Sequence, residues 1–320
     1  MKNLLCTLLC SLVPLFAGNF GRADETSGPG RFRIAGYMPD YRLAAFDPSS
    51  FDGLTDLIVF SAELSQDGAL DLARLKNCPW ARLLRFKTQS RVRLILTIGG
   101  WERSQNFGSI ALAPAKREKC VKSLVRFALD HRLDGIDLDW EHPKNRAEED
   151  AYGQLLQDLH TAFEPHGLML SVTIASWQRL SPQALSAVDH VQIMAYDYDG
   201  KHSTYEQVEG DLRKLIDAGM PAEKIILGLP FYGRDIKTRK AMSYADVIAQ
   251  HAPNRDVNQV GQVYFNGPRM MERKVELAIR TKLGGVMVWE LGQDAAGEHA
   301  LLSVIRNTAS KMPTNSRTAK

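Results

Sequence analysis

The chain has 320 residues, of which 44% are hydrophobic and 24% charged, and its formal net charge is +3. This composition is typical of a globular protein, and it excludes a mainly disordered, collagen-like, coiled-coil or multi-span membrane protein. A nearly neutral chain also gives no electrostatic reason to expect nucleic acid or an anionic membrane as the partner. The length fits one large α/β domain or two modest ones.

Residues 1–23 have the pattern of a secretory signal peptide. After a short basic start, the apolar run 4–17 is too short to span a bilayer, because a spanning helix needs about 20 apolar residues. Small residues follow the run, so that cleavage fits at Ala23 or just after Ala17. We therefore expect a secreted or periplasmic protein in which residues 24–30 form a linker.

Two cysteines follow this leader, Cys78 and Cys120. Export would permit a disulfide between them. Their spacing does not show that they are close, so two buried free thiols are an equal alternative. The sequence has no Cys-x-x-Cys pair and no His/Cys cluster, and a structural zinc site is therefore not expected.

From Arg31 onward, short apolar runs alternate with helical stretches. The runs are rich in Ile, Val, Leu and aromatic residues, as buried parallel strands require. We predict strands at 32–37, 54–61, 92–98, 135–140, 169–175, 190–196, 225–231 and 286–289. We predict helices at 79–87, 114–132, 147–164, 205–218, 269–282 and 295–309, and a shorter crossover at 182–188.

This alternation predicts an α/β fold, a (β/α)₈ TIM barrel over residues 31–309, with 310–320 as a polar tail. A doubly wound open sheet is the alternative. No Gly-x-Gly-x-x-Gly motif follows the first strand, which argues against the Rossmann form of that sheet. In a barrel, catalytic side chains lie at the C-terminal ends of the strands, so polar residues there are the first candidates.

Three acids, Asp137, Asp139 and Glu141, alternate with apolar residues along the predicted strand at 135–140. Alternate residues of a strand share a face, so the acids should face the barrel interior and their apolar neighbours the helices. Adjacent acids would lie about 6.6 Å apart along the strand. Carboxylates that close repel each other, so some must be protonated or hydrogen-bonded.

The chemical interpretation of these acids is acid catalysis. Glu141 comes last and should lie nearest the barrel mouth, whereas Asp139 is one step deeper and could bond either Glu141 or a substrate amide. Asp137 is deepest and could share a proton with Asp139, which would hold Glu141 protonated near neutral pH. The first alternative is a solvated acidic loop, but such a loop would not need an apolar residue at every second position. A Mg²⁺ or Ca²⁺ site is the second alternative, but three acids on one strand form a line rather than a cage.

Residues 134–141, Asp-Gly-Ile-Asp-Leu-Asp-Trp-Glu, resemble the DGxDxDWE signature of family 18 glycoside hydrolases, the chitinase family. The resemblance extends over residues 31–305, because further motifs follow in the family's order. These are Gly36-Tyr37 in the opening strand, Thr97-Ile98-Gly99-Gly100-Trp101 after the third, Met194-Ala195-Tyr196-Asp197 on the sixth, Pro230-Phe231-Tyr232-Gly233-Arg234 on the seventh, and residues 284–290 on the eighth.

The resemblance implies substrate-assisted, retaining hydrolysis of β-1,4-linked N-acetylglucosamine, with no enzyme nucleophile, metal or organic cofactor. It implies that Glu141 protonates the glycosidic oxygen, that Asp139 orients the acetamide N–H, and that Asp137 tunes Asp139. It further implies that Tyr196 donates its hydroxyl to the acetamide oxygen. Trp289 would form a hydrophobic floor, since an aromatic plate suits the apolar face of a sugar.

Other residues at strand ends are candidates for substrate binding, each with a structural alternative. For Trp101 the alternative to a leaving-group plate is loop packing, and for Tyr37 and Tyr232 it is core packing. Arg234 could contact a sugar hydroxyl or Asp197, or form a barrel-rim salt bridge. The full set of binding candidates is Trp289, Tyr37, Trp101, Met194, Asp197, Tyr232 and Arg234.

Two features depart from the family pattern. Thr97 stands where the family usually has Ser, but it keeps the hydroxyl and so can still bond the Asp137 region. Arg234 and Gly284 are only 50 positions apart, and residues 242–265 fill the gap between the seventh and eighth strands. This spacing predicts a reduced insertion and a shallower, more open cleft, which favours endo-cleavage or short oligosaccharides.

The sequence therefore predicts a secreted, monomeric hydrolase. Its expected partner is a polysaccharide or oligosaccharide that contains N-acetylglucosamine; no nucleic acid is expected, and no membrane for the mature form. One alternative is an endo-β-N-acetylglucosaminidase on N-glycans, because the acetamide chemistry is identical. Another is a non-catalytic chitinase-like lectin, although such proteins usually lose the acid, which is present here as Glu141.

Overall fold

The computed structural model describes residues 32–311 of the chain. The predicted signal peptide and linker lie outside the described residues, and so does nearly all of the predicted polar tail. The predicted leader, its cleavage position and the linker therefore stay predictions.

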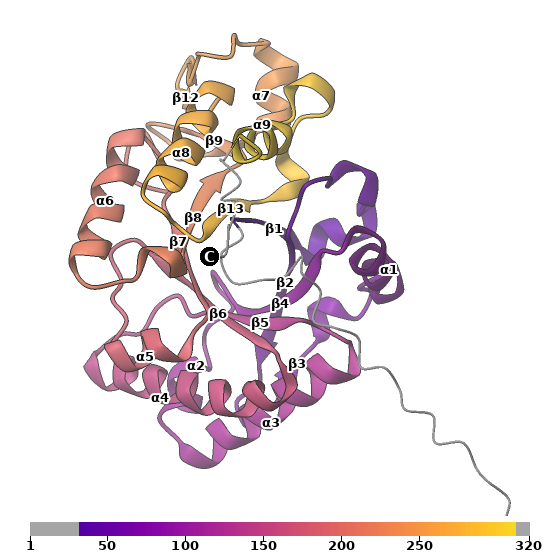
Figure 1. The fold of residues 1–320 in the computed structure, drawn as a ribbon, viewed down its shortest axis with the longest axis vertical. Helices are drawn as coiled ribbons and strands as arrows, with labels where there is room; N and C mark the ends of the chain where they lie inside the picture. Colours follow the sequence, from indigo (N-terminus) through magenta and orange to yellow (C-terminus); the bar gives the residue numbers. More distant parts are fainter. Residues whose placement is uncertain (1–31, 312–320) are drawn as a thin grey trace, which may run out of the picture. The chain divides into compact units, whose positions relative to one another are not determined.

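Parallel strands form a closed barrel in the described part of the chain, seen end-on in Figure 1. Each strand pairs in parallel with the next, and the last also pairs with the first, with Arg33 beside Gly285 and Ala35 beside Met287. This closure confirms the predicted TIM barrel and excludes the open sheet. The barrel strands are β1 (Arg33–Pro39), β2 (Asp56–Leu64), β4 (Arg93–Gly99), β5 (Gly135–Asp139), β6 (Met169–Ala175), β7 (His190–Met194), β8 (Ile225–Pro230) and β13 (Gly285–Trp289).

Helices surround the barrel, and most begin and end within a few residues of the predicted bounds. They are α1 (Trp80–Ser90), α2 (Phe107–Ala111), α3 (Pro114–Asp130), α4 (Arg146–Phe163), α5 (Pro182–Ala187), α6 (Tyr205–Asp217), α8 (Pro268–Arg280) and α9 (Leu301–Ala309). The predicted helix at 295–309 is wrong at its start. Asp294 accepts the backbone N–H groups of Leu301 and Leu302, so its side chain caps a helix that begins only at Leu301.

The alternation along β5 places its two sets of side chains as predicted. Ile136 and Leu138 are buried in the main core, and Trp140 stacks on Phe107 of α2 with ring centroids 5.4 Å apart. The α4 helix covers this face because its apolar stripe points inward: Tyr152, for example, packs edge-on against Trp140 at 5.2 Å. The acids of the same strand consequently face the barrel interior.

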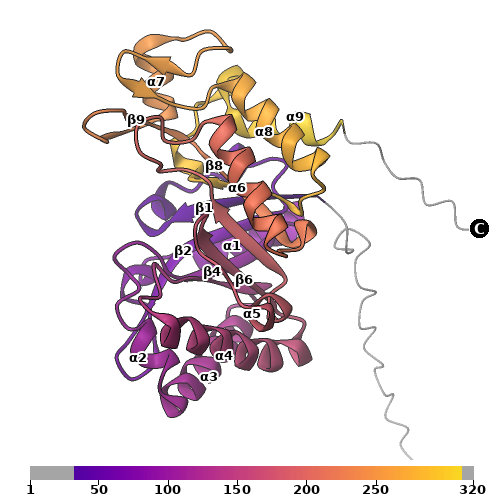
Figure 2. The same ribbon diagram turned by 90° about the vertical axis from the view of Figure 1, so that its left-hand side faces the viewer.

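A short insertion separates β8 from β13, as predicted. It contains the antiparallel strands β9 (Tyr232–Asp235), β10 (Ala241–Ser243), β11 (Gln259–Val260) and β12 (Val263–Tyr264), with α7 (Tyr244–His251) between β10 and β11. Figures 1 and 2 show this small subdomain at the upper end of the barrel domain. A second addition, the short strand β3 (Leu70–Asp71), pairs with the end of β2. No sequence signal predicted these short strands, because each has only two to four residues.

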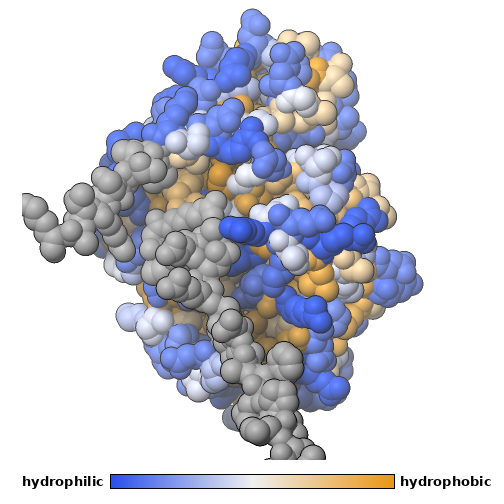
Figure 3. Space-filling view, turned by 45° about the vertical axis from the view of Figure 1, so that its right-hand side comes forward, coloured by the Kyte–Doolittle hydropathy of each residue, from blue (hydrophilic) through white to orange (hydrophobic). Residues whose placement is uncertain are grey.

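Where grey atoms do not cover it, the face shown in Figure 3 carries hydrophilic residues with hydrophobic patches between them. Among residues 32–311, no helix combines the length and the apolar character that crossing a bilayer requires.

Candidate active site

Asp137 lies deepest in the barrel interior and is fully buried. Its carboxylate accepts hydrogen bonds from side chains on four strands: Tyr37 at 3.0 Å, Thr97 at 3.2 Å, Ser171 at 2.7 Å, Thr173 at 3.0 Å and Gln192 at 3.0 Å. Burial raises the pKa of Asp137, and these hydrogen bonds partly oppose that effect. The expected contact with Thr97 is therefore present, so the hydroxyl keeps this function despite the added methyl group.

Asp139 lies one step nearer the mouth, and its carboxyl group has few partners. The group is 3% exposed, and its Oδ1 has no hydrogen-bond partner among the described residues. Burial raises the pKa of Asp139 well above its usual value, and the nearby charges of Glu141 and Asp137 raise it further. A buried oxygen without a partner is uncommon. Asp139 is also one of the residues that line the cavity in which a substrate would lie.

Glu141 follows the end of β5, and its side chain is 11% exposed. Burial, together with the negative charge of Asp197, raises the pKa of Glu141 to about 7, while a hydrogen bond from the backbone of Trp101 acts in the opposite direction. The cause differs from the expectation that a proton shared by Asp137 and Asp139 would keep Glu141 protonated. The oxygens of Asp137 instead accept hydrogen bonds from hydroxyl and amide donors. Burial has the largest effect on the pKa of Glu141.

His142, the next residue, presents one ring nitrogen to this acid. Gln178 Oε1 accepts the backbone N–H of Ala175 at 2.7 Å, so the same oxygen must also be the acceptor for His142 Nδ1 at 2.9 Å. The hydrogen therefore sits on Nδ1 of the neutral ring, and Nε2 faces Glu141 Oε2 at 3.7 Å with its lone pair. Burial lowers the pKa of His142, which favours this neutral form.

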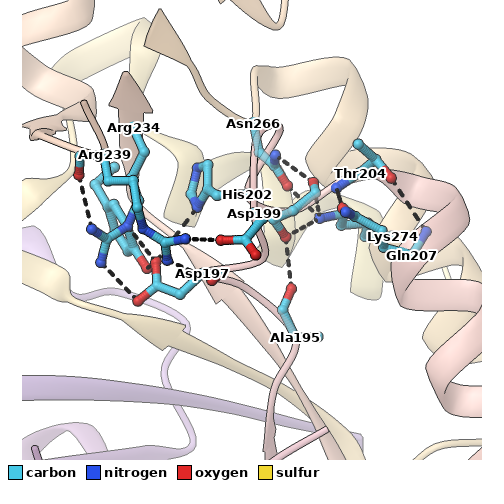
Figure 4. A network of polar contacts seen from close by, with 12 residues as sticks. Ala195, Asp197, Asp199, His202, Thr204, Gln207, Arg234, Arg239, Asn266 and Lys274 are labelled. Atoms are coloured by element: carbon cyan, nitrogen blue, oxygen red, sulfur yellow. Dashed lines mark hydrogen bonds and ion pairs between the residues drawn. The ribbon is translucent and has the colours of Figure 1, made fainter. Parts of the chain in front are cut away.

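The segment after β7 forms the opposite wall of the site, and Figure 4 shows the network that holds it. Asp197 has a φ of +66°, which is uncommon for a residue other than glycine. It accepts hydrogen bonds from Tyr232 at 2.6 Å and from Arg234 at 2.5 and 2.8 Å. Although burial alone would raise the pKa of Asp197, contacts with His202, Arg234 and Tyr232 hold it well below its usual range. Asp197 is consequently a fixed negative charge beside Glu141.

A cavity of about 660 Å³ opens over these acids. Trp289, Phe60 and Tyr37 form its aromatic floor: the ring of Trp289 lies 4.7 Å from that of Phe60 and 5.5 Å from that of Tyr37. Tyr196 and Met194 line the wall. The predicted candidates that line the cavity are Tyr37, Trp101, Asp139, Glu141, Met194, Tyr196, Asp197, Arg234 and Trp289.

Two predicted residues, Asp137 and Tyr232, lie behind this cavity. Asp137 contacts the floor through Tyr37, and Tyr232 bonds Asp197, so each can act on the cavity only through another side chain. For Tyr232 the structure thus combines the two alternatives, a buried core residue that also orients a site carboxylate. For Arg234 it supports the contact with Asp197.

Two tryptophans stand out at the rim because large apolar side chains are seldom this exposed. Trp101 after β4 is 68% exposed, and Trp177 after β6 is 64% exposed. Both line the cavity, and the Trp177 ring lies 4.8 Å from that of His142. Sequence reasoning missed Trp177, because no family motif covers it. The rule that strand ends carry the site would have found it, since β6 ends at Ala175.

The described residues contain no group of three His, Cys, Asp or Glu side chains that could hold a metal ion. The cation site considered for the three acids therefore has no support from their arrangement. Cys78 and Cys120 are free thiols, and burial raises the pKa of each to about 12. Of the two possibilities for these cysteines, the structure shows the unpaired one.

The sequence model of glycosyl hydrolases family 18 matches residues 33–294 of this chain. Among curated proteins, Chitinase 1 of Aphanocladium album is 27% identical over 282 residues, which cover 69% of this chain and 67% of that protein. Probable chitinase 2 of Drosophila melanogaster is 25% identical over 277 residues, covering 65% of this chain and 57% of that one.

Solved structures of low sequence identity share the fold. A family 18 chitinase of Flavobacterium johnsoniae superimposes with a TM-score of 0.78 at 24% identity, covering 91% of this chain and all of that one. A mutant class V chitinase of Cycas revoluta, in complex with (GlcNAc)₃, gives a TM-score of 0.77 at 21% identity, covering 86% and 99%. The chain therefore belongs to family 18 of the glycosyl hydrolases and, with that family, to the glycosidases.

Proposed function

We propose that this protein is a chitinase-type hydrolase that cleaves β-1,4 bonds between N-acetylglucosamine units by substrate-assisted, retaining catalysis. The observation that carries the proposal is the state of Glu141. Its carboxyl group lies at the end of β5, at the edge of an open cavity, with its pKa raised to about 7. Such a group is protonated at neutral or mildly acidic pH and can deliver its proton to a bond in the cavity.

In the first step, Glu141 donates its proton to the glycosidic oxygen as the bond from that oxygen to the anomeric carbon breaks. The acetamide oxygen of the same sugar forms the new bond to the anomeric carbon, which gives a cyclic oxazolinium ion and releases the leaving sugar with its hydroxyl group. Asp139 lines the cavity and accepts the acetamide N–H. The cation that develops beside it favours the ionised form of Asp139, whose negative charge stabilises that cation. Tyr196 donates its hydroxyl to the acetamide oxygen and holds it in line for attack.

In the second step, Glu141 is a carboxylate and takes a proton from water. That water attacks the anomeric carbon, the oxazolinium ring opens, and the product leaves with the β configuration it had in the substrate. Glu141 is protonated again, so the cycle closes without any other proton donor. The two inversions together retain the configuration, which is the expectation for this family.

The aromatic side chains give the binding part of the proposal. Trp289 lies at the cavity floor and can carry the apolar face of the sugar at the scissile bond. Trp101 and Trp177 stand exposed at the rim and suit sugars further along the chain. The chitinase of Cycas revoluta was solved with (GlcNAc)₃, a ligand of the proposed substrate class.

The insertion between β8 and β13 is short and contributes Arg234 and Arg239 to the lining of the cavity. Together with the open rim, it favours internal cleavage or action on short oligosaccharides over processive action from a chain end. No feature of the described residues favours an N-glycan over a chitin oligomer. We also propose secretion, on the strength of the leader pattern in residues 1–23.

Incubation of the purified protein with chitotetraose, at pH 5 to 8, tests the proposal. We expect N-acetylglucosamine oligomers whose new reducing ends are β by NMR before they mutarotate. The E141Q variant keeps the shape of the acid without its proton and serves as the inactive control. Release of glycan from a glycoprotein without cleavage of chitotetraose would favour the N-glycan alternative. Binding of the tetramer without turnover would favour a lectin.

A further inference from the structure

A lysine lies on the apolar stripe of α8 and is completely buried. Lys274 is 0% exposed, and the other buried residues of the helix are apolar, among them Met270 and Met271 one turn earlier and Leu277 and Ala278 one turn later. Isolated buried charges are costly, and buried lysines are rare unless they are paired. No step of the proposed reaction uses this group, so its place in the core needs another explanation.

Three oxygens surround the Lys274 ammonium group (Figure 4). They are the backbone oxygen of Ser203 at 2.9 Å, the hydroxyl oxygen of Ser203 at 2.7 Å, and Oδ1 of Asn266 at 2.5 Å. An ammonium group has three N–H bonds, so each acceptor takes one. All three of these acceptors are neutral oxygens, and none of them belongs to a carboxylate. Burial lowers the pKa of Lys274 well below its usual value, and the charge of Glu206 opposes that shift in part.

The hydroxyl of Ser203 links Lys274 to the segment after β7, which forms one wall of the site. Its oxygen accepts from Lys274 and its hydrogen is donated to the backbone oxygen of Ala195, at 2.7 Å. Ala195 directly precedes Tyr196 and Asp197, so this bond fixes the peptide unit that enters the site. Asn266, which follows β12, donates from Nδ2 to the backbone oxygen of Ser203 at 2.9 Å and so holds the same point from the insertion.

Side chains also hold the segment between Ala195 and Ser203: the hydroxyl of Tyr198 donates to Asp211 at 2.5 Å, and Arg239 donates to the backbone oxygen of Asp197 at 3.1 Å. The backbone N–H of Tyr198 donates to the oxygen of His202, which closes a turn within the segment. Asp197 has a left-handed φ of +66° and therefore needs outside contacts to keep its conformation. His202 is fully buried, with its ring 5.0 Å from that of Tyr232.

We propose that Lys274 is a positioning residue for the reaction: its buried ammonium group clamps Ser203, and through Ser203 the backbone of Ala195, so that Tyr196 and Asp197 face the reacting sugar. This inference rests on the proposed hydrolytic function and adds a residue outside the cavity to it. Lys274 contacts no cavity atom and acts only through the segment after β7.

The test uses K274M, which keeps an unbranched side chain of similar volume, one atom shorter, and removes all three donors. M271A is the matched control, because Met271 is fully buried on the same helix face and its truncation also loosens the core. Each is made alone and together with Y196F, and kcat and KM are measured on chitotetraose beside the melting temperature. A merely structural lysine would lower the melting temperature and leave kcat of the folded enzyme near its wild-type value.

We expect K274M to lower kcat about 10- to 100-fold, on the scale of losses from misplaced catalytic groups, with KM changed less than about threefold. Since Lys274 acts through Tyr196, the Y196F loss should be smaller in the K274M background than in wild type, and unchanged in the M271A background. A kcat within twofold of wild type for K274M, or losses of K274M and Y196F that simply multiply, would overturn the proposal.

Amide hydrogen exchange separates failure of this inference from failure of the proposed function. It reports the segment directly, whether or not the protein cleaves chitotetraose. Exchange at residues 195–203 should be faster in K274M than in M271A when the two are compared at equal global stability. Equal exchange in the two variants would show that Lys274 does not hold the segment, even if wild type proves to be a chitinase.

Discussion

The two walls of the candidate site, β5 and the segment after β7, are built in different ways. On β5, a regular strand places Asp137 and Asp139 by its own alternation, and Glu141 follows at its end. On the opposite wall, Tyr196 and Asp197 lie beyond the strand, and their conformation depends on contacts with β9, α8 and the residues after β12. The comparison teaches that the acids of the first wall are placed by local geometry, while Tyr196 and Asp197 depend on distant parts of the chain.

The sharpest test of the first wall is E141Q. We expect a loss in kcat of about 10²- to 10⁴-fold, the scale of general acid catalysis, because the amide has no proton to donate. Affinity for chitotetraose, measured by calorimetry, should remain within a fewfold of wild type, since the shape is kept. A variant that retained most of its rate would show that the proton comes from another group.

D139N tests the same wall at the next inward-facing residue below Glu141. We expect a loss in kcat of about 10²-fold, because the neutral amide cannot stabilise the cation that forms beside it. The rate should be measured below pH 7, where Glu141 is protonated. L138A on the outward face of β5 serves as the comparison: it should destabilise the fold and leave kcat of the folded enzyme nearly unchanged.

The raised pKa of Glu141 predicts how activity and stability respond to pH. Above about pH 7 the acid is ionised, and kcat/KM should fall about tenfold per pH unit. The folded protein binds this proton more tightly than the unfolded chain does, so stability should decrease as pH rises through the range from about 4.5 to 7. E141Q has no carboxylate that must be ionised in a buried place. At pH 8 its free energy of unfolding should therefore exceed that of wild type by on the order of 1 to 3 kcal/mol in chemical denaturation. Equal stability of the two proteins at pH 8 would contradict the raised pKa.

The smallest effect is expected at the rim, where the two walls open to solvent. W177A should raise KM for chitotetraose about three- to tenfold with little change in kcat, because a stacking surface is lost away from the reacting bond. The effect on chitobiose should be smaller, since a shorter chain reaches fewer rim residues. A loss confined to kcat would place Trp177 in the chemistry and not in binding.

Much of the barrel could be predicted because its strands are continuous apolar runs and its helices carry regular stripes. The start of α9 could not, because the side chain of Asp294 caps the helix at Leu301 and leaves residues 295–300 outside it. The raised pKa of Glu141 was expected, but its cause was not. The sequence suggested coupling along β5 as the cause, whereas burial has the largest effect on this pKa and the charge of Asp197, on the opposite wall, adds to it.

By itself, the sequence determined the order of the strands, the inward direction of the three acids and the family, because period-two alternation and short motifs are local properties of the chain. Only the tertiary structure decided what surrounds those acids. Lys274 is 71 residues away from Ser203 and becomes its partner only when the barrel closes. Burial and charge depend on every atom nearby, and those atoms come from segments that no local pattern brings together.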